Sequence, residues 1–197
     1  MFFVPFVVKC FWEFHSDNRQ RDMDFNADHF ALFDLPRAFR IDSATLDERY
    51  REFQARVHPD RFADADEAQQ RLSLQWATKV NEAYQTLKKP LPRALYLLGL
   101  AGDGVNLADN NAMSAEFLME QMEWREAVAE AREGKAVPEL EELEQRVRAR
   151  IRQGYEQLGE LLDAEQAFGP AADSVRRLMF LEKLLTEIDE ALAALEA

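Results

Sequence analysis

The sequence predicts an all-α protein, in which an antiparallel helical hairpin is followed by a three-helix bundle. Three observations lead to this prediction. Apolar residues recur at the helical period, no segment shows the alternation typical of a strand, and prolines and glycines divide the chain into pieces of helical length. A chain of 197 residues can hold one domain or two small ones.

Two neighbouring segments predict the hairpin. Residues 45–57 place their apolar side chains at helical offsets and so form one stripe, made of Leu46, Tyr50, Phe53 and Val57. Residues 67–87 form a second stripe, made of Trp76, Val80, Ala83, Tyr84 and Leu87. Two such helices with a short connection are expected to pack antiparallel. A short helix over residues 29–35, ended by Pro36, is expected before them.

A polar break separates the two hairpin helices. Pro59 has a fixed φ and no N–H, so it ends the first helix and favours an extended backbone at His58. The carboxylate of Asp60 can bond nearby backbone N–H groups and turn the chain. We therefore expect His58 and Asp60 to lie together at an exposed tip. On these three residues alone, an ordinary connection between two helices is the favoured interpretation.

The second half of the chain predicts the bundle. Pro90 and Pro92 open a short helix over residues 91–98, and the glycine- and asparagine-rich residues 99–111 form a boundary loop. Three longer helices follow. They are expected from the N-cap Ser114 to a stop at Gly134, from Pro138 to a stop at Gly169-Pro170, and along a final stripe that holds Leu178, Leu181, Leu185, Ile188, Leu192 and Leu195.

Charge is distributed unevenly between these two parts. Residues 25–102 hold 11 acidic and 11 basic side chains, whereas residues 112–197 hold 20 acidic and 10 basic ones, a net charge of −10. An acidic surface argues against nucleic acid as a partner. No apolar run is long enough for a membrane span. The single cysteine, Cys10, excludes an internal disulfide and a cysteine-based metal site, and it favours a reducing, cytoplasmic location.

Four large apolar residues are predicted to face away from the core of the bundle. On the helix after Ser114, the buried stripe is formed by Phe117, Trp124, Val128 and Ala131, which fall within about 40° of one direction at 100° per residue. Apolar residues that point elsewhere are Leu118, Met119 and Met122 on this helix and Phe180 on the last one. Such residues form an interface if they are contiguous, or else another part of the chain covers them.

The flanking sequence adds a resemblance to a known family. His-Pro-Asp, preceded by TLDERYREFQARV and followed by VNEAYQTLKKP, resembles the J-domain of proteins that assist DnaK-type chaperones. The segments KKPLPRALYLLGL, AEFLMEQMEWREA and ADSVRRLMFLEKL resemble the HscB family of J-domain co-chaperones of iron–sulfur cluster assembly. The resemblance runs from about His29 to the end of the chain.

This resemblance implies a function and a set of site residues. It implies a J-domain at residues 25–102 that stimulates the ATPase of a specialised DnaK-type chaperone, HscA, and a scaffold-binding domain at residues 112–197 that delivers the iron–sulfur scaffold, IscU. The chaperone-binding residues implied are His58, Pro59, Asp60, Arg49 and Arg56. Arg49 and Arg56 flank the apolar stripe, where a solvated face is the alternative. The scaffold-binding residues implied are Leu118, Met119, Met122 and Phe180.

Other classes of function fit the residues less well. No nucleophile pairs with His58 or Asp60, no histidine pair has metal-ligand spacing, and no glycine-rich loop follows a strand. We therefore expect no catalytic residues, no metal, no cofactor, no nucleic-acid or membrane partner, and a monomer. The alternative function is a general J-domain protein that delivers unfolded clients to DnaK. The absence of a glycine/phenylalanine-rich linker and of cysteine-rich zinc repeats counts against it.

The first 24 residues fit none of these elements. MFFVPFVVKCFWEF is apolar and aromatic, but it lacks a basic start and a cleavage site and is too short for a membrane span. We expect this extension to reflect a wrongly assigned start codon, with Met23 as the true initiator. Intact-mass measurement of the native protein tests this expectation, because a mass that includes Phe2 contradicts it.

Overall fold

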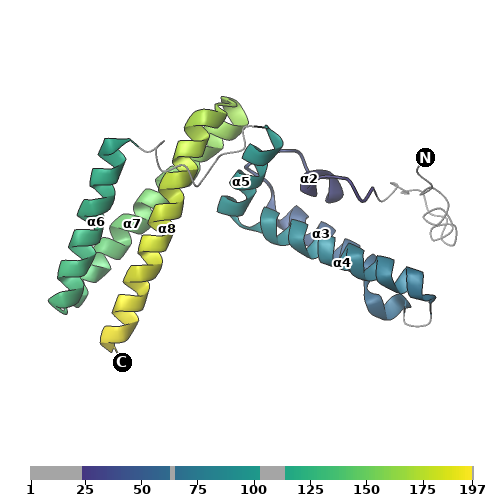
Figure 1. The fold of residues 1–197 in the computed structure, drawn as a ribbon, viewed down its shortest axis with the longest axis horizontal. Coiled ribbons are helices and arrows are strands. Elements are labelled where there is room, and N and C mark those ends of the chain that lie inside the picture. Colours follow the sequence, from purple (N-terminus) through teal and green to yellow (C-terminus); the bar gives the residue numbers. More distant parts are fainter. Residues whose placement is uncertain (1–23, 63–64, 103–113, 197) are drawn as a thin grey trace. The chain divides into compact units, whose positions relative to one another are not determined.

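The computed structural model describes residues 24–62, 65–102 and 114–196, and every regular element within them is helical, as predicted (Figure 1). The extension at residues 1–23 lies outside the described residues. The chain forms two compact units. The described residues up to Pro36, together with Ile41–Lys88, form the first unit, and Arg37–Arg40 with Lys89–Ala197 form the second.

Within its described residues, the first unit contains three α-helices and one 3-10 turn. They are α2 (His29–Leu32), α3 (Ser43–Val57), η1 (Pro59–Phe62) and α4 (Glu67–Lys88). Asp28 and Asp42 cap the N-termini of α2 and α3, each through a carboxylate that accepts two backbone N–H groups. The predicted stripes are confirmed, because Leu46, Phe53 and Val57 of α3 are buried together with Trp76, Val80, Ala83 and Leu87 of α4.

Side-chain contacts confirm that α3 and α4 run antiparallel. Near one end of the hairpin, Lys88 of α4 donates to both carboxylate oxygens of Asp47 of α3, at 2.6 and 2.7 Å. Midway along it, the rings of Tyr50 and Tyr84 stack with their centroids 3.9 Å apart. At the other end, the hydroxyl of Ser73 donates to the carbonyl of Val57 at 2.9 Å. The start of one helix therefore meets the end of the other.

The first helix ends earlier than predicted. It was expected to run to Leu35 and to end at Pro36, but α2 ends at Leu32. Asp34 adopts φ +54°, its N–H donates to Ala31, and the N–H of Leu35 donates to the carbonyl of Phe30. These two bonds form a Schellman motif, which ends a helix before any proline is reached.

The part of the second unit that the structure describes contains four α-helices and a π-helical turn. They are α5 (Pro90–Leu100), α6 (Ala115–Glu133), α7 (Val137–Gly159), the π-helical turn η3 (Glu160–Ala164) and α8 (Phe168–Glu196). Ser114 caps α6 as predicted, because its Oγ accepts the N–H of Phe117 at 3.2 Å. Helices α6, α7 and α8 lie side by side in the predicted bundle (Figure 1).

Two predicted boundaries in this unit are wrong. Gly169-Pro170 was expected to end the helix that Pro138 begins, but η3 ends that helix and Gly169-Pro170 lies in the first turn of α8. Proline is tolerated there because the first N–H groups of a helix have no intrahelical partner. Gly99 was expected in the boundary loop, but α5 includes it. The rest of that loop, residues 103–113, lies outside the described residues.

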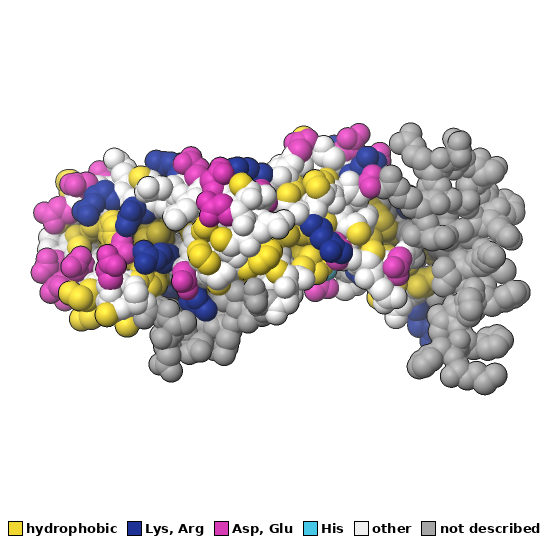
Figure 2. Space-filling model, turned by 90° about the horizontal axis from the view of Figure 1, so that it is seen from above, with side chains coloured by type: hydrophobic (Ala, Val, Ile, Leu, Met, Phe, Trp, Pro, Cys, Tyr) yellow, Lys and Arg dark blue, Asp and Glu magenta, His cyan; other side chains and the backbone are white. Residues whose placement is uncertain are grey.

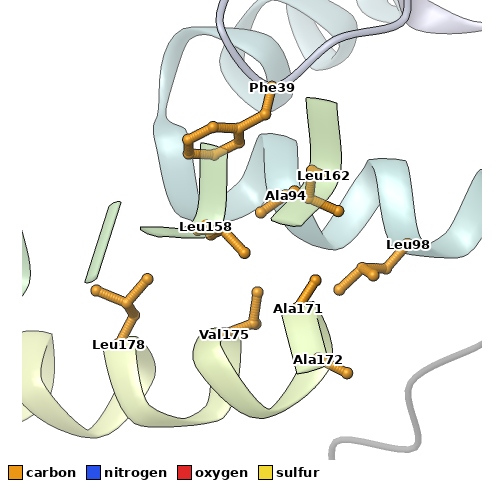
Figure 3. Close-up of a cluster of buried hydrophobic side chains, with 9 residues drawn as sticks. All are labelled: Phe39, Ala94, Leu98, Leu158, Leu162, Ala171, Ala172, Val175 and Leu178. Carbon is orange, nitrogen blue, oxygen red and sulfur yellow. The ribbon is translucent and has the colours of Figure 1, made fainter. Parts of the chain in front are cut away.

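Two clusters of buried apolar residues hold the second unit together. The first cluster joins α5 and the segment before α3 to α7, η3 and α8, and its buried members are Phe39, Ala94, Leu98, Leu158, Leu162, Ala171, Ala172, Val175 and Leu178 (Figure 3). The second joins α6, α7 and α8 through Val128, Ala131, Leu140, Leu143, Val147, Leu184, Ile188 and Ala191. Helix α5, which lies within the predicted J-domain bounds of residues 25–102, packs in the second unit.

A short segment from the first half of the chain is built into this unit. The backbone N–H groups of Phe39 and Arg40 donate to the two carboxylate oxygens of Asp163 in η3, at 2.6 and 2.9 Å. The guanidinium of Arg93 donates to the carbonyl of Phe39 at 2.5 Å, and Arg40 pairs with Glu160 at 2.6 Å. The π-helical turn thus presents Asp163 to a segment more than 120 residues away in sequence. Within the described residues, no helix is both long and apolar enough to cross a bilayer.

Candidate functional site

The His58-Pro59-Asp60 segment forms the tip of the α3–α4 hairpin. His58 follows the last residue of α3 and has φ −59° and ψ 127°, the extended geometry expected before a proline. Pro59 then begins η1. The backbone N–H of Asp60 donates to Nδ1 of His58 at 3.3 Å, and a carboxylate oxygen of Asp60 lies 3.7 Å from the same nitrogen. The structure therefore brings the His58 and Asp60 side chains together, as the sequence predicted.

Residues that the sequence reasoning missed hold this tip in place. The buried hydroxyl of Ser73 satisfies the carbonyl of Val57 at the end of α3. Arg61 makes two contacts, because its N–H donates to the carbonyl of His58 at 3.0 Å and its guanidinium donates to the carbonyl of Ala55 at 2.8 Å. Carbonyls at a helix C-terminus need such donors. The sequence offered one signal for this contact. Ser73 falls at a buried position of α4, and a buried hydroxyl needs a hydrogen-bond partner.

The two side chains at the tip are open to solvent. The His58 side chain is 57% exposed and that of Asp60 is 90% exposed. Among the described residues, no lysine or arginine forms an ion pair with Asp60, since the guanidinium of its neighbour Arg61 bonds backbone instead. A solvated carboxylate on a supported turn is available to accept a charge-assisted hydrogen bond from a partner.

The two predicted arginines lie on α3, before the tip. Arg49 is 3.4 Å from the carboxylate of Glu52, and such an exposed pair is weak. The guanidinium of Arg56 lies over the ring of Phe53, 5.5 Å from its centroid. Partial burial lowers the pKa of Arg56 from its ordinary value, and the nearby carboxylate of Glu52 opposes this shift. Arg56 therefore packs on the hairpin, whereas Arg49 pairs with Glu52.

A second candidate site is an apolar surface on α6. Leu118, Met119 and Met122 are exposed by 44, 63 and 71%, and we call these three residues the α6 patch. They lie within about one turn of helix, since residues three and four apart are neighbours on a helix surface. The predicted buried stripe behind them is confirmed for Phe117, Val128 and Ala131, with Trp124 partly buried. Hydrophobic side chains reach the surface among charged ones on the bundle side of Figure 2.

Phe180 is less exposed than the sequence predicted. Instead of pointing to solvent it is partly buried, because its ring meets the ring of Phe117 edge to face at 6.0 Å. The guanidinium of Arg125 lies over the ring of Phe180 at 5.7 Å, and that of Arg177 lies over Phe117 at 5.0 Å. Periodicity along α8 could not show that α6 supplies a ring at this point. Met179, beside it, is exposed by 40%, and the sequence reasoning missed it.

Charged residues fix α6 to both other helices beside the patch. Glu120, between Met119 and Met122 in sequence, accepts a hydrogen bond from Arg150 of α7 at 2.8 Å. The other carboxylate oxygen of Glu120 is 3.9 Å from Arg177 of α8. These contacts orient the turn of α6 that carries the patch. Among the described residues, no group of three or more histidine, cysteine or acidic side chains is placed to hold a metal ion.

An exposed His-Pro-Asp tip on an antiparallel hairpin, with a helical bundle in the second unit, is the arrangement that the resemblance to J-domain co-chaperones implies. The model of the "HSCB C-terminal oligomerisation domain" matches residues 113–189, which contain α6, α7 and most of α8. The matched residues include the α6 patch and Phe180.

Comparisons over the whole chain extend this match to the hairpin. The co-chaperone protein HscB homolog of Aromatoleum aromaticum is 53% identical over 174 residues, which cover 88% of this chain and 98% of that protein. The solved structure of HscB from Vibrio cholerae has a TM-score of 0.75 and 38% identity, and covers 86% of this chain and 99% of its own. The solved structure of human HscB has a TM-score of 0.79 and 30% identity, and the match covers 91% of this chain and 93% of the human chain. The chain belongs to the HscB family of co-chaperones.

Proposed function

We propose that this chain stimulates ATP hydrolysis by an HscA-like DnaK-type chaperone and delivers an IscU-like iron–sulfur scaffold to it. In this proposal the J-domain tip contacts the chaperone and the α6 patch contacts the scaffold. ATP binds to the partner, so the chain activates an ATPase without being an enzyme itself. Membership of the HscB family supports a chaperone partner.

The observation that carries the first half of the proposal is the exposed tip. The Asp60 carboxylate is solvated, and Pro59, Ser73 and Arg61 fix the turn on which it lies. A charge-assisted hydrogen bond from a basic group of the chaperone is stronger than a neutral one. If that contact forms only in the hydrolysing state of the ATPase, it shifts the chaperone toward that state.

The tip is tested by removing one charge without changing its shape. Asp60→Asn is expected to abolish ATPase stimulation and to leave the melting temperature unchanged, because the carboxylate supports no packing. Glu48→Gln is the matched control, since it removes one exposed carboxylate from α3. If folded Asp60→Asn protein stimulated the ATPase normally, the proposal for the tip would be wrong.

The α6 patch supports the second half of the proposal. Three large apolar side chains within about one turn of a helix are more than the isolated exposed residues that any surface carries. Flexible methionines suit a surface that must adapt to a partner. Phe180 contributes an aromatic edge that is already held by Phe117 and Arg125, so it needs little ordering on binding.

Titration of the scaffold tests the patch. Replacement of Leu118 and Met122 by alanine is expected to weaken scaffold binding about tenfold, as truncation of interface anchors does. Leu74→Ala is the matched control, since Leu74 is an apolar residue on α4 whose exposure, 59%, lies between those of Leu118 and Met122. Phe180→Ala is expected to weaken binding and also to lower the melting temperature, because it removes packing against Phe117. Unchanged affinity in the Leu118/Met122 variant would overturn this assignment.

A general J-domain protein that delivers unfolded clients to DnaK is the alternative. The two functions are distinguished by measuring stimulation of an HscA-like and a general DnaK-type ATPase, each with and without the scaffold. The proposal predicts that the scaffold increases stimulation only with the HscA-like partner. We further propose that the protein acts as a monomer in the cytoplasm, without nucleic acid, membrane, metal or cofactor, and sedimentation of the purified protein tests the monomer.

A further inference from the structure

All three methionines within the described residues are exposed. The chain has six methionines, and the structure describes Met119, Met122 and Met179. Met122 is 71% exposed, Met119 is 63% exposed and Met179 is 40% exposed. Methionine usually fills gaps in cores, where oxidants reach it slowly. Here the two most exposed methionines belong to the α6 patch.

We propose that Met119 and Met122 are sites of reversible oxidation to methionine sulfoxide by hydrogen peroxide, and that this oxidation prevents the α6 patch from docking. The part of the proposal that concerns docking rests on the function proposed above. The oxidation itself depends only on the exposure of the two thioethers.

The reaction is a transfer of one oxygen atom. A lone pair of the thioether sulfur attacks one oxygen of hydrogen peroxide, the O–O bond breaks, and a sulfur–oxygen bond forms. The remaining oxygen leaves with both protons as water, so the sulfur is oxidised and the peroxide is reduced. Methionine sulfoxide reductases reverse the step by reducing the sulfoxide with thiols, which releases water.

Oxidation changes the character of the patch but leaves the helix in place. The sulfoxide is polar, and burying its oxygen against an apolar partner without a hydrogen bond is unfavourable. Both side chains point away from the buried stripe of Phe117, Val128 and Ala131, so the core of the bundle is not altered. The expected result is a loss of scaffold affinity of roughly tenfold or more with little change in the melting temperature.

The test compares the wild-type chain with Met119→Leu/Met122→Leu. Leucine keeps the apolar character, the approximate volume and the helix propensity, but it has no sulfur to oxidise. Each protein is treated with hydrogen peroxide, the peroxide is removed with catalase, and scaffold binding and peptide masses are measured. The variant keeps Met179 and the methionines outside the described residues, so it controls for oxidation elsewhere.

We expect peptide masses to show oxidation of Met122 and Met119 before Met179, in the order of their exposure. Treated wild type should lose affinity about tenfold and regain it after incubation with the two reductases, MsrA and MsrB. The affinity of the leucine variant, whatever its value before treatment, should not change on treatment. Prior binding of the scaffold should slow oxidation of both patch methionines.

Three results would overturn the proposal. They are equal affinity of oxidised and untreated wild type, an equal loss of affinity in the leucine variant, and oxidation of Met179 ahead of Met119 and Met122. If untreated wild type fails to bind the scaffold, the function proposed above is wrong and the switch is wrong with it. Failure of the proposed function can be told apart from failure of the oxidation, because the order of oxidation is measured from peptide masses without any scaffold.

Discussion

The α3–α4 hairpin and the α6–α8 bundle carry the two candidate sites in opposite ways. The hairpin presents two polar side chains, His58 and Asp60, on either side of a proline, and the chain itself fixes their geometry through Pro59 and the bonds from Ser73 and Arg61. The bundle presents the apolar side chains of the α6 patch from one helix, and α8 supplies Phe180, whose ring meets Phe117 of α6. Its site depends on how α6 is rotated against α7 and α8, which Phe117 and Glu120 fix. A polar turn can therefore be recognised locally, whereas an apolar surface depends on packing.

The largest effect on stability is expected from a cavity in the core of the hairpin or of the bundle. Leu140 of the bundle and Leu87 of the hairpin are both fully buried. Either leucine-to-alanine change should lower the free energy of unfolding by about 3 kcal/mol. Hydrogen exchange should show the loss of protection in α6–α8 for Leu140→Ala and in α2–α4 for Leu87→Ala. If each change instead lowered hydrogen-exchange protection equally throughout the chain, the hairpin and the bundle would not be separate cooperative units.

A smaller effect tests the packing of the bundle at two glycines of α7, Gly154 and Gly159. A Cβ on Gly154 would lie 2.8 Å from Cδ2 of the buried Leu178, so Gly154→Ala should cost about 1–3 kcal/mol. A Cβ on Gly159 would meet the side chain of Arg40, which is 54% exposed and can move. The gain in helix propensity, up to about 1 kcal/mol, then offsets the contact in Gly159→Ala. Thermal unfolding should show a lower melting temperature for Gly154→Ala than for Gly159→Ala. Equal destabilisation of the two variants would contradict this account of the packing.

The smallest effect concerns support of the tip. Ser73→Ala removes the donor to the carbonyl of Val57 and should cost about 1 kcal/mol. Because the end of α3 then loses one restraint, ATPase stimulation is expected to fall partially, by less than for Asp60→Asn. Scaffold affinity should not change. A Ser73→Ala protein with full stimulation would show that the tip is held without this bond.

The sequence predicted the helices well because their signals are local. The stripes of α3, α4 and α6, the Ser114 cap and the extended His58 each depend on residues within a few turns. The exposure of the α6 patch was also predicted by periodicity, and it agrees with the structure. The ends of helices were predicted less well. Asp34 takes the left-handed position that closes α2, and glycine usually marks such a position.

The features that were not predicted depend on distant parts of the chain. Asp163 binds the backbone of Phe39 and Arg40 from more than 120 residues away, and no periodicity within one segment could indicate this. The same holds for Phe180, whose burial depends on Phe117 of another helix. The preference of α5 for the second unit likewise depends on Leu158 and Leu162 of α7 and η3. Packing between elements, rather than local propensity, decided each of these.

The most direct test of the account is the ATPase rate of the HscA-like chaperone with the Leu118→Ala/Met122→Ala variant, measured against scaffold concentration. The account holds that the tip and the patch act through different partners, and that joining them raises the effective concentration of scaffold at the chaperone. It predicts wild-type stimulation without scaffold, and a scaffold response shifted to about tenfold higher concentration. Loss of the scaffold-free stimulation in this folded variant, or an unshifted scaffold response, would contradict it.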